Sequence, residues 1–219
     1  KSFCIDSKTC SVYNEKLINS RFLIKKKVDP IDNLKSIKNN TEIKNMIEAH
    51  IKDGVAVTKF LYWIKNSNIR KLDEIKVEKK LESFRKQSKN YLFPSFSTIA
   101  GSGPNGAIIH YRSNIKSNRK LNKDHLLLVD SGGQYKWGTT DITRTISFSD
   151  PSKKTKELYT RVLKGHIAVA MSKIDKLKNG NNLDKIARKS LNSVNLNYSH
   201  GTGHGVGFFM NVHEGPQSI

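Results

Sequence analysis

The sequence predicts an α+β fold, because segments with helical spacing stand before and after a group of short apolar segments typical of strands. The clearest helix covers residues 41–66, where apolar side chains recur every three or four positions from Ile43 to Tyr62. The clearest strands are residues 126–131 and 141–148, which a glycine-containing loop joins. Sheet and helices therefore belong to one domain, which we expect to begin near residue 41.

The segment before residue 41 has a different character. Residues 2–5 could form a short strand, and residues 12–18 a helix or a strand. Residues 25–40 are interpreted as a charged connector in which Asp29 and Pro30 make a turn. Composition and periodicity change at residue 41, so we divide the chain into residues 1–40 and 41–219.

The remaining elements follow from local signals. A second helix is predicted from about Asp73 to Lys89, then a strand over 93–100 that ends in a Gly-Ser-Gly-Pro-Asn-Gly turn, and another strand over 107–111. Asp150 followed by Pro151 is typical of a helix start, and this helix is expected to end near Ile174. A last helix is predicted over 183–194, before a glycine-rich end.

Charge and composition exclude some functions and leave others open. The 219 residues carry a net charge of +20, from 39 basic and 19 acidic side chains. Most of the basic residues are lysines spread along the chain without interleaved aromatics, so we interpret them as solvated surface rather than a nucleic-acid site; a polyanion patch is the alternative. No apolar run could span a bilayer. Cys4 and Cys10 are expected to be reduced thiols, with a local disulfide as the alternative, and a cytoplasmic protein is expected.

Two short motifs are judged to be coincidental. Gly101, Gly103 and Gly106 match a dinucleotide-binding pattern, but a strand rather than a helix is expected to follow them. His200 and His204 have the spacing of zinc ligands on a helix, but the glycines around them make a helix implausible.

The residues that point to chemistry are two aspartates and several histidines. Asp130 closes a buried strand and Asp141 opens the next, so the chain between them could bring both carboxylates together. Adjacent carboxylates repel unless one is protonated or a metal ion neutralises both; the alternative is that Asp130 caps a turn and Asp141 is solvated. Four histidines lie beside strand or glycine-rich segments, which favours a metal or substrate site: His110, His200, His204 and His213.

Three segments resemble the metal-site segments of aminopeptidase P, the Xaa-Pro aminopeptidases: GSGPNGAIIHYR (101–112), LLLVDSGGQYKWGTTDITRTISF (126–148) and SHGTGHGVGFFMNVHEGP (199–216). The resemblance implies the pita-bread fold of the creatinase, methionine aminopeptidase and prolidase families: a curved, mostly antiparallel sheet flanked by helices, here truncated at its C-terminal end. It also implies that residues 1–40 are the tail of a preceding non-catalytic domain and connector, and that 41–219 are an incomplete catalytic domain.

The resemblance also implies a ligand set. Asp130 would chelate one divalent metal ion, Asp141 would bridge two, and His204 would bind the other. His110, His200 and His213 would contact substrate, with His110 or His213 as the catalytic hydrogen-bond donor. Two further glutamate ligands are expected beyond Ile219, and Glu214 is not expected to be one of them. The metals would be Mn²⁺, with Co²⁺ or Zn²⁺ as alternatives.

The implied activity is release of the N-terminal residue from peptides with proline in second position, this chain being an inactive fragment of the enzyme. A prolidase-type dipeptidase and a catalytically dead peptide-binding relative are the alternatives. The expected partners are such peptides and, as an option, a second copy of the chain; no membrane or nucleic-acid partner is expected.

Overall fold

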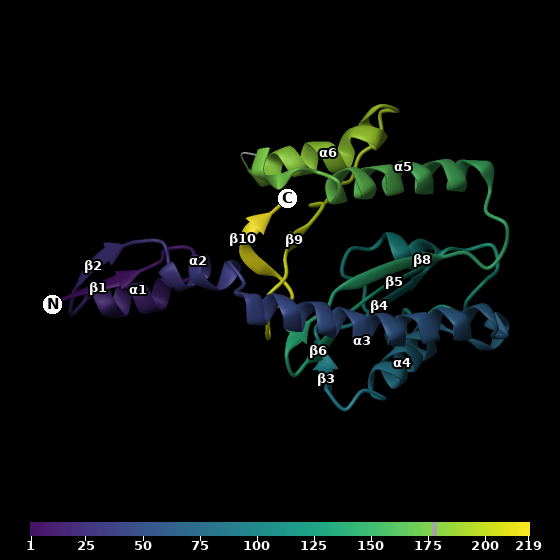
Figure 1. Cartoon of the computed structure of the whole chain (residues 1–219), viewed down its shortest axis with the longest axis horizontal. Helices are drawn as coiled ribbons and strands as arrows, with labels where there is room; N and C mark the ends of the chain where they lie inside the picture. The colour runs from purple at the N-terminus through teal and green to yellow at the C-terminus, as the bar shows by residue number, and fades with distance from the viewer. Residues whose placement is uncertain (177–178) are drawn as a thin grey trace. The chain divides into compact units, whose positions relative to one another are not determined.

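The computed structural model describes residues 1–176 and 179–219 (Figure 1). Its backbone divides into two compact units, residues 1–37 and residues 38–219. The change in composition at residue 41 lies close to this division. The assignment of the first unit to the tail of another domain stays a prediction.

The first unit is a small α/β arrangement. Strands β1 (Ser2–Ile5) and β2 (Leu23–Lys26) pair in parallel, and helix α1 (Val12–Asn19) connects them. The turn expected at Asp29 and Pro30 is wrong, because a short helix α2 (Pro30–Ser36) begins there. Its start has a physical reason: the Asp29 side chain accepts a hydrogen bond from Ile31 N, and proline fits the first helical turn. Both cysteines are free.

Four helices of the second unit correspond to the predicted ones. They are α3 (Asn40–Lys65), α4 (Glu74–Arg85), α5 (Lys153–Ala170) and α6 (Gly180–Asn192). A capping box between Asn39 and Glu42 starts α3, and the Asp73 side chain caps α4. The structure ends α5 before the predicted Ile174, which begins a separate 3-10 turn, η3 (Ile174–Lys176).

Two small antiparallel sheets lie beside α3 and α4. One has the order β4 (Ile99–Ser102), β5 (Leu127–Ser131), β8 (Ile142–Ile146), and the other the order β3 (Tyr91–Pro94), β6 (Gly133–Tyr135), β7 (Gly138–Thr139). The single strand predicted over 93–100 is therefore wrong. The chain leaves one sheet after Pro94 and enters the other at Ile99, because β3 pairs with β6 while β4 pairs with β5.

The strand predicted over 107–111 is also wrong. Residues 103–107 form a 3-10 turn, η2 (Gly103–Ala107), and His110 adopts a left-handed backbone with φ 55°. A buried carboxylate explains the difference, because Glu74 Oε2 accepts a hydrogen bond from Tyr111 Oη at 2.7 Å and Glu74 Oε1 accepts one from Asn105 Nδ2 at 3.0 Å. These bonds tie the segment to α4. The glycines open a 3-10 turn and not the α-helix that a dinucleotide-binding motif requires.

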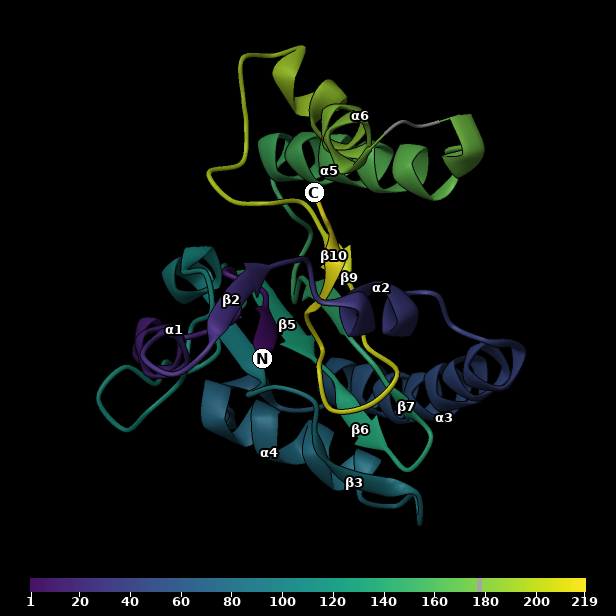
Figure 2. The ribbon, with the colours of Figure 1, turned by 90° about the vertical axis from the view of Figure 1, so that its left-hand side faces the viewer.

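The hydrophobic core lies between α3, α4 and the β4-β5-β8 sheet. It contains Val57, Phe60, Ile64, Val77, Leu81, Ala100, Leu121, Leu127, Val129 and Ile146. Helices α5 and α6 pack on each other, and the strand pair β9 (His204–Gly205) and β10 (Glu214–Ser218) runs between them and the sheet (Figures 1 and 2). Across the residues that the structure describes, no helix is both long and apolar enough to cross a membrane.

Candidate metal site

The two aspartates meet at one end of the β4-β5-β8 sheet. Asp130 lies on β5 with its carboxylate on the face opposite the buried Val129 and Ser131, as strand alternation requires. Thr143 Oγ1, on the neighbouring strand, donates a hydrogen bond to Asp130 Oδ1 at 2.7 Å. Asp141 directly precedes β8, and its side chain lines the same pocket as that of Asp130. The structure thus brings the two acids close together.

The chain between the aspartates is not a simple hairpin. It forms β6 and β7, which join the second sheet, and it returns so closely that Thr140 N donates to Gly133 O at 2.9 Å. A Cβ atom at Gly132 would overlap the carbonyl oxygen of Thr140 and the hydroxyl of Ser95. Glycine at 132 is therefore required for the close approach of the two segments that carry Asp130 and Asp141.

The negative charges of Asp130 and Asp141 are only partly compensated by their surroundings. Burial raises the pKa of Asp141 to about 6, and the nearby charge of Asp130 adds to the shift while His204 opposes it. Two neighbouring carboxylates cannot both ionise without a cost in electrostatic free energy. A divalent cation between them would remove that cost, since it interacts favourably with both negative charges.

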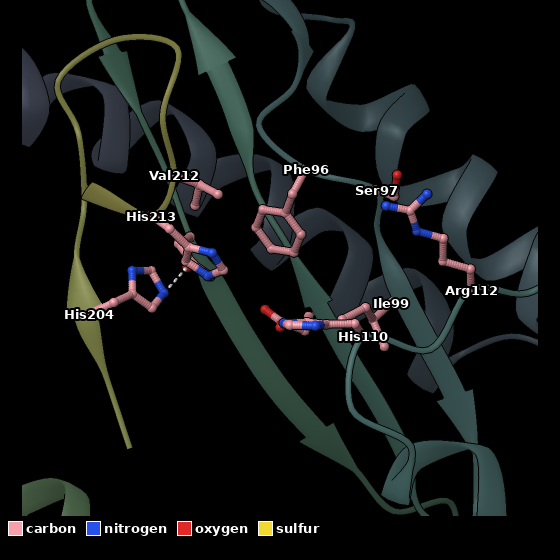
Figure 3. A pocket seen from close by; sticks show the side chains of 10 residues that line it. Phe96, Ser97, Ile99, His110, Arg112, His204, Val212 and His213 are labelled. Carbon is pink, nitrogen blue, oxygen red and sulfur yellow. Dashed lines mark ion pairs between the residues drawn. The ribbon is translucent and has the colours of Figure 1, made fainter. Parts of the chain in front are cut away.

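Three histidines, labelled in Figure 3, line the same pocket as the aspartates. His204 Nε2, on β9, lies 3.3 Å from Asp141 Oδ2, and the rings of His204 and His213 meet edge to face with centroids 4.0 Å apart. The His110 ring centroid is 6.3 Å from that of His213. Burial and the neighbouring His204 and His110 lower the pKa of His213, which favours its neutral form. His213 is thus available as a hydrogen-bond donor or acceptor at neutral pH.

The two aspartates and the three histidines line one pocket of about 300 Å³. Its lining residues are Phe96, Ser97, Ile99, His110, Arg112, Asp130, Asp141, His204, Val212 and His213. Sequence reasoning did not single out Phe96, Arg112 or Val212, because no local pattern marks an isolated apolar or basic residue as part of a pocket. Two of them lie inside recognised segments, Arg112 in 101–112 and Val212 in 199–216, but nothing in those segments marked them as pocket residues.

His200 does not reach this pocket. It lies in a separate hollow of about 260 Å³ beside α5 and α6, with its Nδ1 atom 2.7 Å from Gly201 O. The glycines near His204 approach the chain itself rather than an open space: Gly203 N bonds to Ile219 O at 3.1 Å, and Gly207 N to Asn211 O at 2.8 Å. Glu214 is buried and pairs with Lys38 Nζ at 2.7 Å, outside the pocket.

The donor chemistry fits divalent metal ions, although the ligand set is not closed. Carboxylate and imidazole are suitable donors for Mn²⁺, Co²⁺ or Zn²⁺, and Asp130, Asp141 and His204 present both kinds to one pocket. Within residues 1–176 and 179–219, however, no group of three or more His, Cys, Asp or Glu side chains has the geometry to hold a metal ion. The three candidates therefore need further ligands to form a complete site.

A mixed sheet-and-helix domain with two carboxylates and histidines at one sheet end has the donor types of a metal-dependent enzyme. Comparison with known proteins makes the assignment specific. Residues 44–219 match the model of metallopeptidase family M24, and the chain belongs to this family. The prediction of the family from the three sequence segments is thereby confirmed.

Individual relatives agree with this assignment. The chain is 46% identical over 198 residues to Xaa-Pro aminopeptidase 1 of Dictyostelium discoideum, covering 88% of this chain and 31% of that protein. X-prolyl aminopeptidase from Caenorhabditis elegans, described as a cytosolic enzyme with a di-nuclear active site, superposes with a TM-score of 0.84 at 36% identity, over 90% of this chain and 32% of that one.

Prolidase from Pyrococcus horikoshii OT3 superposes with a TM-score of 0.82 at 30% identity, over 99% of this chain and 60% of that one. The predicted pita-bread fold is confirmed by these likenesses. The chain spans about a third of the length of its aminopeptidase relatives.

Proposed function

We propose that this chain forms part of the catalytic domain of an Xaa-Pro aminopeptidase, in which Asp130, Asp141 and His204 are metal ligands. The observation that supports the proposal most is that these three side chains, separated along the sequence, line one pocket with His110 and His213. The identity to the aminopeptidase of Dictyostelium discoideum supports the reaction, and the C. elegans enzyme, described as di-nuclear and cytosolic, supports two metal ions and a cytoplasmic location.

Each residue has a role in the proposed reaction. Two divalent ions, for which we propose Mn²⁺, would supply Lewis acidity that activates water and polarises a peptide carbonyl. Asp130 and Asp141 would hold them by charge, and His204 by its imidazole nitrogen. His213 or His110 would donate a hydrogen bond to the oxyanion that develops at the carbonyl of the first residue. The lowered pKa of His213 is compatible with a neutral donor.

Substrate selection is proposed to depend on shape. A peptide bond before proline has no N–H group, so a pocket cannot recognise it through that donor. Phe96, Ile99 and Val212 supply an apolar surface beside the carboxylates against which a pyrrolidine ring could pack. The free amino group of the substrate would lie at the carboxylate end of the pocket, which restricts cleavage to the first residue.

The test is peptide hydrolysis by the full-length protein loaded with Mn²⁺. We expect release of the first residue from an Xaa-Pro-Xaa tripeptide, and loss of both turnover and Mn²⁺ binding in Asp141→Asn. Lys164→Ala, on the exposed surface of α5, serves as the control and should retain activity. Undiminished turnover in Asp141→Asn would show that the proposed site is wrong.

Prolidase activity is the second candidate, favoured by the superposition on the Pyrococcus horikoshii enzyme. The same assay separates the two: a prolidase cleaves Xaa-Pro dipeptides and spares the tripeptide. A protein that binds Xaa-Pro peptides but cleaves neither the dipeptide nor the tripeptide would instead be a catalytically dead relative.

A further inference from the structure

A buried ion pair lies behind the candidate metal site, on the opposite side of the sheet end. Arg85, at the end of α4, binds Asp53 of α3 through two hydrogen bonds, Nε to Oδ1 at 2.6 Å and Nη2 to Oδ2 at 3.0 Å. The two residues are 1% and 0% exposed. Such a bidentate arrangement fixes both groups in one geometry.

The ion pair is also hydrogen-bonded to three residues on or next to the strands. Arg85 Nη2 donates to Ser131 Oγ at 3.1 Å, and Asp53 accepts from Thr140 Oγ1 at 2.7 Å and from Tyr135 Oη at 3.0 Å. Ser131, Tyr135 and Thr140 are each at most 1% exposed. The five side chains therefore form one water-excluded network, which we call the Asp53–Arg85 network.

Two members of the network are the chain neighbours of the two aspartates. Ser131 follows Asp130 on β5, and Thr140 precedes Asp141, the residue just before β8. Adjacent residues of an extended chain point to opposite faces, so the network side chains face inward while the carboxylates face the pocket. One buried ion pair is thus hydrogen-bonded to both chain segments, at the residues next to the candidate ligands and on the side away from the pocket.

Stability alone does not account for so polar a core. A buried ion pair costs desolvation that a well-packed apolar cluster of similar volume would avoid, so its retention is weak evidence for a role in stability. Hydrogen bonds, unlike apolar contacts, fix direction and distance. A dinuclear site needs that, since two carboxylates must be held at a set separation despite their mutual repulsion.

We propose that Asp53 and Arg85 are positioning residues, which set the separation of Asp130 and Asp141 through Ser131 and Thr140. The inference rests on the proposed metal-binding function and deepens it. The network would act on metal affinity and coordination geometry without contacting metal or substrate.

The experiment uses single, nearly isosteric changes in the full-length protein. Thr140→Val removes the hydroxyl bonded to Asp53, and Ser131→Ala removes the one bonded to Arg85; neither touches a carboxylate of the pocket. The control is Leu81→Ala on α4, which opens a cavity in the core and removes none of the hydrogen bonds of the network. Each variant is titrated with Mn²⁺ alone by calorimetry, and its Co²⁺-loaded form is examined by visible absorption.

We expect Thr140→Val and Ser131→Ala to weaken Mn²⁺ binding by about tenfold or more and to change the Co²⁺ spectrum, in line with residues that orient metal ligands from behind. Leu81→Ala should lose thermal stability yet keep wild-type affinity and spectrum. Wild-type affinity and spectrum in Thr140→Val and Ser131→Ala would overturn the inference alone. Equal losses in Leu81→Ala would also overturn it, since destabilisation would then explain the effect. A wild-type protein that binds neither Mn²⁺ nor Co²⁺ would overturn the proposed function as well.

Discussion

The carboxylate of Glu74 offers the sharpest test of how the fold places His110. Glu74 is fully buried at the first turn of α4 and accepts hydrogen bonds from four donor groups. The donors, with their distances, are Ser102 N at 2.7 Å and Asn105 Nδ2 at 3.0 Å to Oε1, and Tyr111 Oη at 2.7 Å and Arg119 N at 2.9 Å to Oε2. They enclose the loop that carries His110.

The perturbation is Glu74→Gln, which keeps the volume and replaces one carboxylate oxygen by an amide group. The oxygen that remains can serve two of the donors. Tyr111 Oη can turn and accept from the new amide, but the Arg119 backbone N–H cannot, so a part-buried donor is left unpaired at a cost of about 1–3 kcal/mol. Each remaining bond also loses its charge-assisted part, about 1 kcal/mol. The variant no longer buries a charged carboxylate, which offsets some of this loss. We therefore expect the free energy of unfolding to fall by about 2–4 kcal/mol.

The assay is urea unfolding, with hydrogen exchange at Ser102 and Arg119 as the local readout. Because small domains have only about 5–15 kcal/mol of stability, this loss would displace the transition clearly. Glu78→Gln is the matched control: it lies on the same helix, is only partly buried, and accepts one hydrogen bond, from Ser113 Oγ at 3.2 Å. Glu78→Gln should change stability by less than about 1 kcal/mol. The reasoning is refuted if both variants unfold alike and exchange at Arg119 is unchanged.

Three further changes test other parts of the structure. The folded-state pKa of Asp141, about 6 against an ordinary 3.8, means that the metal-free fold binds a proton that the unfolded chain releases, so its stability falls as pH rises through that window. Asp141→Asn should abolish this slope and raise the free energy of unfolding at neutral pH by about 1–3 kcal/mol, measured with chelator at acidic and neutral pH; an unchanged slope contradicts it. Phe60→Ala removes a core ring that is 1% exposed and should cost about 3–5 kcal/mol in urea unfolding, and a cost under about 1 kcal/mol would mean that the α3 interface is loose. Gly132→Ala places a methyl group against the Thr140 carbonyl and should cost about 1–3 kcal/mol or more, with Gly54→Ala, which has open space on α3, as a control that does not lose stability.

Helices and the central strand pair were predictable because their signals are local. The spacing from Ile43 to Tyr62 reflects a face that packs on the core, and Asp73 carries the capping chemistry that begins α4. The strand expected over 107–111 was wrong for a non-local reason. Its apolar residues are typical of a strand, but Glu74, which is distant in sequence, accepts hydrogen bonds from Asn105 and Tyr111 and holds the segment as a loop.

The aspartates and histidines were found by type and position, and the motifs around them identified the family. The family resemblance implied that His204 is a metal ligand and that His200 contacts substrate, whereas the structure puts only His204 in the pocket with Asp141. The difference arises from strand pairing. His204 lies on β9, which pairs with β10, whereas His200 lies in the segment before β9, beside α5 and α6.

By itself the sequence determined the fold class, the family and the identity of the candidate ligands, since periodicity, caps and motif spacing are written along the chain. The tertiary structure decided which of those groups meet. The segments that carry Asp130 and Asp141 approach closely because Gly132 admits the Thr140 carbonyl, and a buried Asp53–Arg85 pair from two helices is hydrogen-bonded to both segments. Such contacts join residues far apart in the chain, and hydrogen-bond geometry in a water-excluded core, rather than local propensity, fixes them.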